Sequence, residues 1–457
     1  MSRNRIISQS EAIYVGPSPA TGYHFTLTLG SGSAGEIAGL PSGVPVNYGY
    51  SGYYPNGEVH LKSRSATALT ESLSGFMFDG GSAPISGVII HNEISQLHRV
   101  QGYSHDFSQS RTDVNQLGQL ARIDSINNTT PIVNFSFSYL LANMANEQAL
   151  GFVTDGETSA LTNILNNNEE EKNYFVKTVS EGVDAIGGGV TDASTDIVGV
   201  GNGFVTSYTS EASVGSFPTV NIAVEALNLE FMTGASGNAI PAVNPANGGR
   251  ITETLNTYNS RIRFDLPSAT ENPSGLLTGV GSISTLRPGD ITMTFTKHGS
   301  QTAYDALGAK IEESTSKLQS YNLSINLSRT PIEKLGSRFA FTREIDFPAP
   351  ITLSVDAIVD NIRTGGLVDR IDCDEEYDVT INIKDPSTCD GGTQVDVAKY
   401  VLKKLTLDSQ SYSSSIGANK TVTLDFSTQV QGPNQTGIGI FMSGRALDGS
   451  VLTDVVE

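Results

Sequence analysis

The chain has 457 residues, 48 acidic against 28 basic side chains, and a formal net charge of −20. This balance argues against a surface that grips nucleic-acid phosphates, because such binding depends on Lys and Arg. Charged residues make up only 17% of the chain, and the abundance of Gly, Ser, Thr and Asn favours strands and turns over helices. No apolar run reaches the length of a membrane span, so we expect a protein made and kept in a cytoplasm.

The N-terminal segment, residues 1–25, is predicted to be an extended arm, because Pro17 and Pro19 resist regular structure. With little core of its own, it is either a disordered tail or a strap across a neighbouring subunit. Further on, Pro55-Asn56-Gly57 before the alternating EVHLKS predicts a hairpin turn that enters a strand. Two more strands are expected within residues 69–78 and 85–91.

The stretch VQGYSHDFSQSRTDVNQLG, residues 100–118, returns in degraded form as LQSYNLSINLSRTPIEKLG, residues 318–336. The offset is constant at 321 − 103 = 218, and it matches Arg111 with Arg329 and Gly118 with Gly336. A unit repeated at a fixed offset predicts one folded module used twice. The paired glycines are expected to supply a turn with positive φ.

The repeated unit reads as strand, turn, strand. In the second copy apolar and polar side chains alternate with period two, which is typical of a half-buried strand. The apolar positions are Tyr321, Leu323, Ile325 and Leu327, and the polar ones are Asn322, Ser324, Asn326 and Ser328. The next strand is predicted in both copies, with Phe135, Phe137 and Tyr139 on one face in the first and Leu353, Val355 and Ala357 in the second.

Each copy of the repeated unit is followed by a further segment that also matches between the two copies. Residues 210–229 resemble residues 413–430, with Val220, Ile222 and Val224 alternating in the first and Val422, Leu424 and Phe426 in the second. Here the offset is 417 − 215 = 202, so the first copy should carry an insertion of 16 residues. A short helix around Leu161, Ile164 and Leu165 is the candidate for it, and residues 303–319 are a weaker helical candidate in the second copy, since Gly308 interrupts them.

These patterns predict a mainly β protein with two tandem domains, each carrying long hairpins and one short helix. The expected division is an arm (1–25), a first domain (26–232), a linker (233–250), a second domain (251–431) and a C-terminal extension (432–457). The linker is predicted from its content of Gly, Asn and Pro, and the C-terminal extension is expected to contribute little to the core.

No catalytic, cofactor or metal site is predicted. The histidines at 91, 98 and 105 lack matching carboxylates, and the acidic run at 372–378 lacks the spacing of a calcium loop, so a solvated loop is the better interpretation. Cys373 and Cys389 could pair with each other, but free thiols are the preferred interpretation. The repeated residues include no acid, base or nucleophile, which argues against an enzyme.

The best repeated polar side chains are Arg111 and Arg329. Each either forms a bidentate pair with a carboxylate of the adjoining subunit or bonds local carbonyls at a strand end. Both alternatives stay open. Candidate inter-subunit contacts are Arg111, Asp113, Asn115, Arg329, Tyr103 and Tyr321. The second copy has TPIEK where the first has TDVNQ, so contacts of Asp113 and Asn115 are expected in one domain only.

The chain resembles bacteriophage tail tube proteins, most closely the kind in which one polypeptide carries two tube domains. The residues behind this resemblance are ISQSEAIYVGPSPATGY, LHRVQGYSHDFSQSRTDVNQLGQLARID, FSFSYLLANMANEQALGF and the second copy of the repeated unit. The resemblance implies β-sandwich or barrel domains whose long strands join those of neighbouring subunits around a lumen. A ring of six domains would then need three such chains, arranged with pseudo-sixfold symmetry.

The same resemblance implies a virion tail location, after assembly in the host cytoplasm, and stacked trimeric rings that conduct DNA without binding it. Tail terminator, tape measure and baseplate or tip proteins are the implied partners, with no cofactor. An acidic wall would suit such a conduit, because it repels DNA. A capsid decoration protein or adhesin is the alternative, since it would share the β, Gly and Asn bias. A carbohydrate-active enzyme is third, and it would use paired carboxylates such as Asp374 and Glu376.

Overall fold

A computed structural model gives the fold of the chain. It describes residues 10–17, 94–127, 129–165, 170–181, 185, 195–233, 241–244, 286–299, 317–336, 339–340, 342–358, 376–384, 396–416, 419–430, 432–433 and 435–444, and, as strands only, 24–27, 50–53, 61–63, 89–90, 249–250, 263–264, 305–306 and 309–310. The fold is mainly β, as predicted, and most long strands belong to one antiparallel sheet that runs through both halves. No helix in these residues is both long and apolar enough to cross a membrane.

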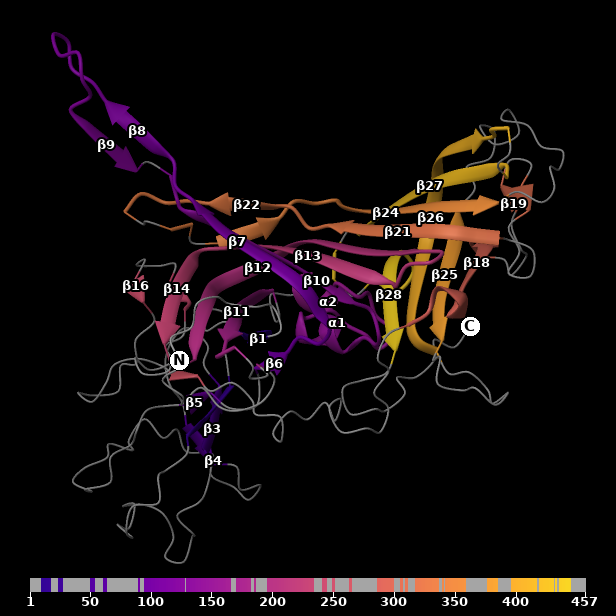
Figure 1. Ribbon diagram of the computed structural model, residues 1–457, viewed down its shortest axis with the longest axis horizontal. Helices are drawn as coiled ribbons and strands as arrows, with labels where there is room; N and C mark the ends of the chain where they lie inside the picture. Colours follow the sequence, from indigo (N-terminus) through magenta and orange to yellow (C-terminus); the bar gives the residue numbers. More distant parts are fainter. Residues whose placement is uncertain are drawn as a thin grey trace, which may run out of the picture.

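Eight strands of this sheet come from the first half of the chain, which also contributes a separate two-stranded hairpin and two short helices (Figure 1). The strands are β1 (Glu11–Pro17), β6 (Ser95–Gln96), β7 (Val100–Ser108), β8 (Arg111–Val114), β9 (Asp124–Asn127), β10 (Ile132–Leu140), β11 (Glu171–Thr178), β12 (Asp196–Ser213), β13 (Thr219–Ala226) and β14 (Asn228–Thr233), of which β8 and β9 pair only with each other. The helices are α1 (Ala145–Ala149) and α2 (Thr162–Leu165).

The second half repeats this arrangement. Its strands are β18 (Ile291–Lys297), β21 (Lys317–Asn326), β22 (Arg329–Ile332), β23 (Thr342–Ile345), β24 (Ala349–Ile358), β25 (Tyr377–Lys384), β26 (Asp396–Ser413), β27 (Thr421–Val430) and β28 (Gly439–Gly444), and a 3-10 turn, η3 (Pro288–Asp290), precedes β18. Smaller pieces are β2 (His24–Leu27), β3 (Tyr50–Tyr53), β4 (Leu61–Ser63), β5 (Ile89–Ile90), β15 (Val243–Asn244), β16 (Gly249–Arg250), β17 (Arg263–Phe264), β19 (Asp305–Ala306) and β20 (Ala309–Lys310).

The duplication is preserved in the strand register. Phe135 on β10 lies opposite His105 on β7, and Leu353 on β24 lies opposite Leu323 on β21, so both pairs differ by 218 residues. The β8–β9 and β22–β23 hairpins pair at the same offset. Gly118 and Gly336 both have φ of 89°, which confirms the predicted positive-φ turns.

Each half folds its strands into two packed layers, because its longest strand bends. Asn202 on β12 and Lys404 on β26, 202 residues apart, have φ of 55° and 57°, and a register shift interrupts the pairing of each strand close by. β12 thus pairs first with β11 and β14 and then with β13. The layers meet through aromatic rings, with 5.5 Å between the ring centroids of Phe135 and Tyr174.

The predicted apolar faces are confirmed. In both copies the apolar positions that alternate along β10, β13, β21, β24 and β27 are buried. Of the two helices, α2 confirms the short helix predicted around Leu161, Ile164 and Leu165, whereas α1 was not predicted. The helical candidate at 303–319 is wrong where the structure describes it, since β19 and β20 lie there as a strand pair and β21 begins at Lys317.

Both chain ends contribute core strands. Ile13, Tyr14 and Val15 on β1 are buried, and β1 pairs with β11, so the expectation of little core for the N-terminal segment is wrong over these residues. The same correction applies to the C-terminal extension, where Phe441 and Met442 on β28 are buried and the strand pairs with β26. The hairpin expected around residues 55–57 is confirmed by the β3–β4 pairing. The strand expected at 69–78, the cysteines and residues 372–375 lie outside the described part.

Part of the predicted linker packs against β12. A Cβ on Gly201 would lie 2.4 Å from the carbonyl oxygen of Pro241, which is backbone and has little freedom to yield. We expect Gly201→Ala to lower the free energy of unfolding by about 1–3 kcal/mol through overpacking. Urea denaturation checks this. Gly102→Ala on β7 is the control, because no atom lies within 4 Å of its Cβ position; an equal loss in both variants would contradict the explanation.

Candidate assembly seam and polar sheet face

The two halves of the chain join edge to edge. Residues 207–213 at the end of β12 pair with residues 320–326 of β21, with Thr209 opposite Ser324 and Glu211 opposite Asn322. We call this the β12–β21 seam. It continues the strand order of one half directly into the other, β7-β10-β13-β12 followed by β21-β24-β27-β26. Figure 1 shows these strands running side by side along the long axis of the molecule.

One end of the seam is held by two ion pairs whose arginines are buried. The Arg329 guanidinium, at the start of β22, donates to the Glu170 carboxylate just before β11, and Arg343 on β23 donates to Glu225 on β13. The side chains of Arg329 and Arg343 are 0% and 1% exposed. Each pair links the β22–β23 hairpin of the second half to a strand or loop of the first. This hairpin therefore fastens the two halves beyond the backbone pairing.

Arg329 makes three kinds of contact at this point. Besides Glu170, it donates to the Arg343 carbonyl oxygen at 3.1 Å and lies over the Phe204 ring, 4.9 Å from its centroid. Burial lowers the pKa of Arg329 from its usual value, and the Glu170 carboxylate partly offsets this. Its Nε and Nη2 have no hydrogen-bond partner, so the guanidinium depends heavily on its one carboxylate.

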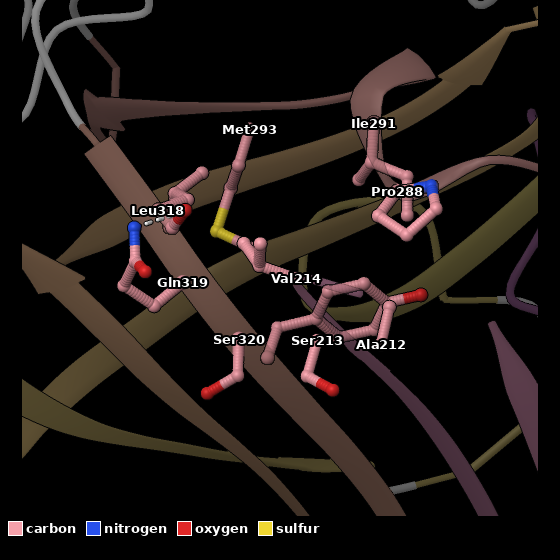
Figure 2. A pocket seen from close by; sticks show the side chains of 10 residues that line it. Ala212, Ser213, Val214, Pro288, Ile291, Met293, Leu318, Gln319 and Ser320 are labelled. Atoms are coloured by element: carbon pink, nitrogen blue, oxygen red, sulfur yellow. Dashed lines mark hydrogen bonds between the residues drawn. The ribbon is translucent and has the colours of Figure 1, made fainter. Parts of the chain in front are cut away.

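The other end of the seam carries a small pocket of about 60 Å³ (Figure 2). Ala212, Ser213 and Val214 approach from the end of β12, and Leu318, Gln319 and Ser320 from the start of β21. Pro288, Ile291 and Met293 from η3 and β18 close it. The lining holds neither a carboxylate nor an amine, and we assign it no chemistry.

A second contact between the halves lies away from the seam. The loop between α1 and α2 pairs with the edge of β28, where the Gly156 and Ala160 amides donate to the Met442 and Ile440 carbonyls at 2.9 Å. This loop covers a strand edge of the second half that would otherwise be open.

One face of the continuous sheet is polar over all eight strands. The residues that share this face by register are Ser104, Asp106, Asn134, Ser136, Ser138, Asn221, Ala223, Glu225, Ser207, Thr209, Glu211, Ser320, Asn322, Ser324, Asn326, Thr352, Ser354, Asp356, Thr423, Asp425, Ser427, Ser409 and Ser411. We call it the polar face. It includes five carboxylates, and none of its residues is Lys, Arg or His.

Hydroxyl groups hold several of these carboxylates. Asp425 accepts from Ser354 at 2.6 Å and from Ser409 at 2.5 Å, which lowers its pKa. Asp356 accepts from Ser320 and Thr423 at 2.7 and 2.6 Å. The hydrogen bonds to Asp425 favour the charged form of that carboxylate.

Within the described residues, the two outermost strands of this eight-strand array, β7 and the last part of β26, each have one edge that pairs with no other strand. β7 pairs with β10 on one side only, and the last part of β26 pairs with β27 on one side only. Large apolar side chains lie exposed there, Phe107 at 66% and Tyr412 at 41%. Long open edges of this kind invite pairing with another strand.

The predicted contact residues lie in three places. Arg329 and Tyr321 lie inside the molecule at the seam, where Tyr321 is within 3.3 Å of Ser210. Arg111, Asp113 and Asn115 are exposed on the β8–β9 hairpin, which projects away from the body (Figure 1), and Asp113 pairs with Arg122 of the same hairpin at 2.9 Å. The Tyr103 hydroxyl donates to Glu11 at 2.9 Å.

Sequence reasoning missed Glu170, Arg343 and Glu225. Arg343 matches Ser125 at the offset of 218, so a search for repeated polar residues does not select it. Glu170 lies in a run of three acidic residues, which looked like a solvated helix end. In the described residues no cluster of His, Cys, Asp or Glu could hold a metal ion.

No protein-family model and no curated protein matches this chain. Among solved structures, a chain of the anti-feeding prophage baseplate is 12% identical, with 34% of this chain and 92% of that chain covered and a TM-score of 0.23. A chain of the native gene transfer agent virion and one of the empty gene transfer agent tail are each 12% identical, with coverage of 33% and 98% and a TM-score of 0.20. TM-scores of this size do not establish a shared fold.

Proposed function

We propose that this protein is a structural component of a bacteriophage tail, and that its copies join edge to edge into rings that stack as a tail tube. The β12–β21 seam carries the proposal. β7 is the duplicate of β21 and β26 is the duplicate of β12, so each chain presents at its two ends the same pair of edges that it already joins internally. Joining β26 of one copy to β7 of the next repeats that seam between chains. Such a contact is heterologous and closes into a ring when the rotation allows.

The duplication also gives the register of this contact. Adding 202 to β12 positions and subtracting 218 from β21 positions converts the seam Thr209–Ser324 into Ser411–Asp106. In the same way Ser210–Leu323 becomes Tyr412–His105, which would cover Tyr412 at the interface. Six equivalent halves would fill a closed ring, and three chains supply them.

Arg111 takes the place of Arg329 at the seam between chains. We propose that it reaches a carboxylate of the neighbouring copy, as Arg329 reaches Glu170 within one chain. Alignment of β11 with β25 makes Glu375 the counterpart of Glu170, although Glu375 lies outside the described residues. Tyr103, Asp113 and Asn115 would lie close to the same contact.

The polar face would line the ring on its inner side. Ser, Thr and Asn side chains keep such a surface wet, and the carboxylates on that face, of which Glu225 is paired with Arg343, would repel DNA phosphates. DNA would pass without binding, and the protein would have no enzymatic role. Tail terminator, tape measure and baseplate or tip proteins are the proposed partners of the tube in the virion, after assembly in the host cytoplasm.

Directed disulfide formation tests the register. In a background with Cys373→Ser and Cys389→Ser, we expect Ser411→Cys with Asp106→Cys to cross-link adjacent copies upon oxidation. Denaturing electrophoresis should show dimers and then trimers as the largest species. Ser411→Cys with Gly102→Cys, displaced by four residues on the same face of β7, is the matched control. Equal cross-linking of the control would reject the register, and a ladder beyond trimers would reject the closed ring of three chains.

A further inference from the structure

A buried carboxyl lies between the halves of the chain, away from the polar face. Glu147 on α1 is 0% exposed. The Tyr139 and Tyr208 hydroxyls donate to its Oε1 at 2.7 and 3.2 Å, while its Oε2 has no hydrogen-bond partner. A carboxylate held by two neutral donors and no cation is costly to bury charged.

The second half of the chain completes this site. The Tyr400 hydroxyl, from β26, lies 2.8 Å from the Tyr208 hydroxyl, so a chain of hydrogen bonds runs from Glu147 across the boundary. The facing titratable groups are tyrosines on all four packed strands: Tyr139 on β10, Tyr208 on β12, Tyr321 on β21 and Tyr400 on β26. On the α1 side, Asn146 bonds the backbone of His98 at 2.9 Å. Docking of the second half therefore excludes water from Glu147.

From this geometry we infer that Glu147 takes up a proton when the two halves of the chain dock, so that docking is linked to pH. Burial raises the pKa of Glu147 from 4.5 to about 7, against the opposing effect of the tyrosine hydrogen bonds. The docked chain holds a proton that the unfolded chain releases between these values. Stability from this group is therefore greatest at low pH, falls as the pH rises from about 4.5 to 7, and stays low above 7.

The tyrosine cluster around Glu147 belongs to the boundary between the two halves of one chain and is not duplicated. At the duplicated positions, Ala357 replaces Tyr139 and Gln410 replaces Tyr208, while Val198 stands where the second half has Tyr400. A contact between copies would lack this cluster. The inference thus concerns the single chain and holds or fails independently of the proposed function.

Denaturation across pH tests it. We expect Glu147→Gln, which keeps the shape without the charge, to raise the urea midpoint relative to wild type progressively from pH 5 to about pH 7, with little further change up to pH 8. The control is Glu157→Gln, an exposed carboxylate ten residues away, whose difference from wild type should stay constant over the same range. If the profiles of wild type and Glu147→Gln run parallel, the inference is overturned.

Infrared spectroscopy of the wild-type chain provides a second measurement that does not depend on a variant folding. A protonated carboxyl band is expected in the folded chain at pH 6, and it should fade as the pH rises through about 7. Unfolding at pH 6 should release about one proton from this group, detectable with a pH indicator in weak buffer. A folded chain that shows no such band at pH 6 would rule out proton uptake by Glu147.

Discussion

Arg329→Ala is expected to lower the free energy of unfolding by about 3–5 kcal/mol, because it leaves the mostly buried Glu170 carboxylate, 11% exposed, without its partner. Arg111→Ala, the same change at the duplicated position, should leave unfolding within about 0.5 kcal/mol of wild type, since Arg111 is exposed in the single chain. The proposed function predicts the opposite order for assembly, with Arg111→Ala forming fewer rings from a normally folded chain. Urea denaturation and sedimentation of the same preparations measure both.

Comparison of Arg329→Ala with Arg111→Ala distinguishes an effect on the stability of the single chain from an effect on ring assembly. Glu170→Gln combined with Arg329→Met should recover part of the lost stability, because neither side chain then leaves a buried charge. Arg111→Lys keeps the charge but not the planar guanidinium, so it tests whether a bidentate contact is needed. Unchanged ring yield for Arg111→Ala would remove this residue from the interface between copies.

Leu117→Ser combined with Leu120→Ser is expected to abolish tubes while leaving the chain folded. Both leucines are fully exposed at the tip of the β8–β9 hairpin. Full burial of a leucine contributes about 1.5–3 kcal/mol, so a ring-to-ring contact through this tip would weaken by well over about tenfold. Exposed Val214, Phe217 and Ile416, in the turns after β12 and β26, offer apolar surface at the opposite end of the strands.

Negative-stain microscopy should show single rings in place of tubes for this double variant. Gln119→Ser, in the same turn, is the control and should form tubes of normal length. Tubes formed equally well by the leucine variant would exclude the hairpin tip from stacking, whereas loss of rings as well would place it in the contact within a ring.

The sequence carried enough information to predict the repeated strands. Period-two alternation at Leu323, Ile325 and Leu327 reflects a sheet with one face on the core, and that physical requirement is local. Gly118 and Gly336 were likewise predictable, because positive φ selects glycine at a turn. The matching offsets then extended the prediction from the clearer second copy to the first.

Other features depend on contacts between distant segments. β1 was hidden because Pro17 and Pro19 dominate the local pattern, although the proline-free residues before them pair with β11. The Arg329–Glu170 pair joins residues 159 apart, and no spacing rule selects one carboxylate among 48. Glu147 resembled an ordinary surface residue of a short polar segment. Its burial follows only from the docking of the second half.

Because β12 and β21 belong to one polypeptide, half of the contacts in a ring of three chains would form without a bimolecular encounter. A tether of this kind holds its two edges at a high effective concentration and makes that contact insensitive to dilution. Dilution would therefore act only on the three contacts between chains. A ring that comes apart should break into whole chains along those lines, with each internal contact left intact.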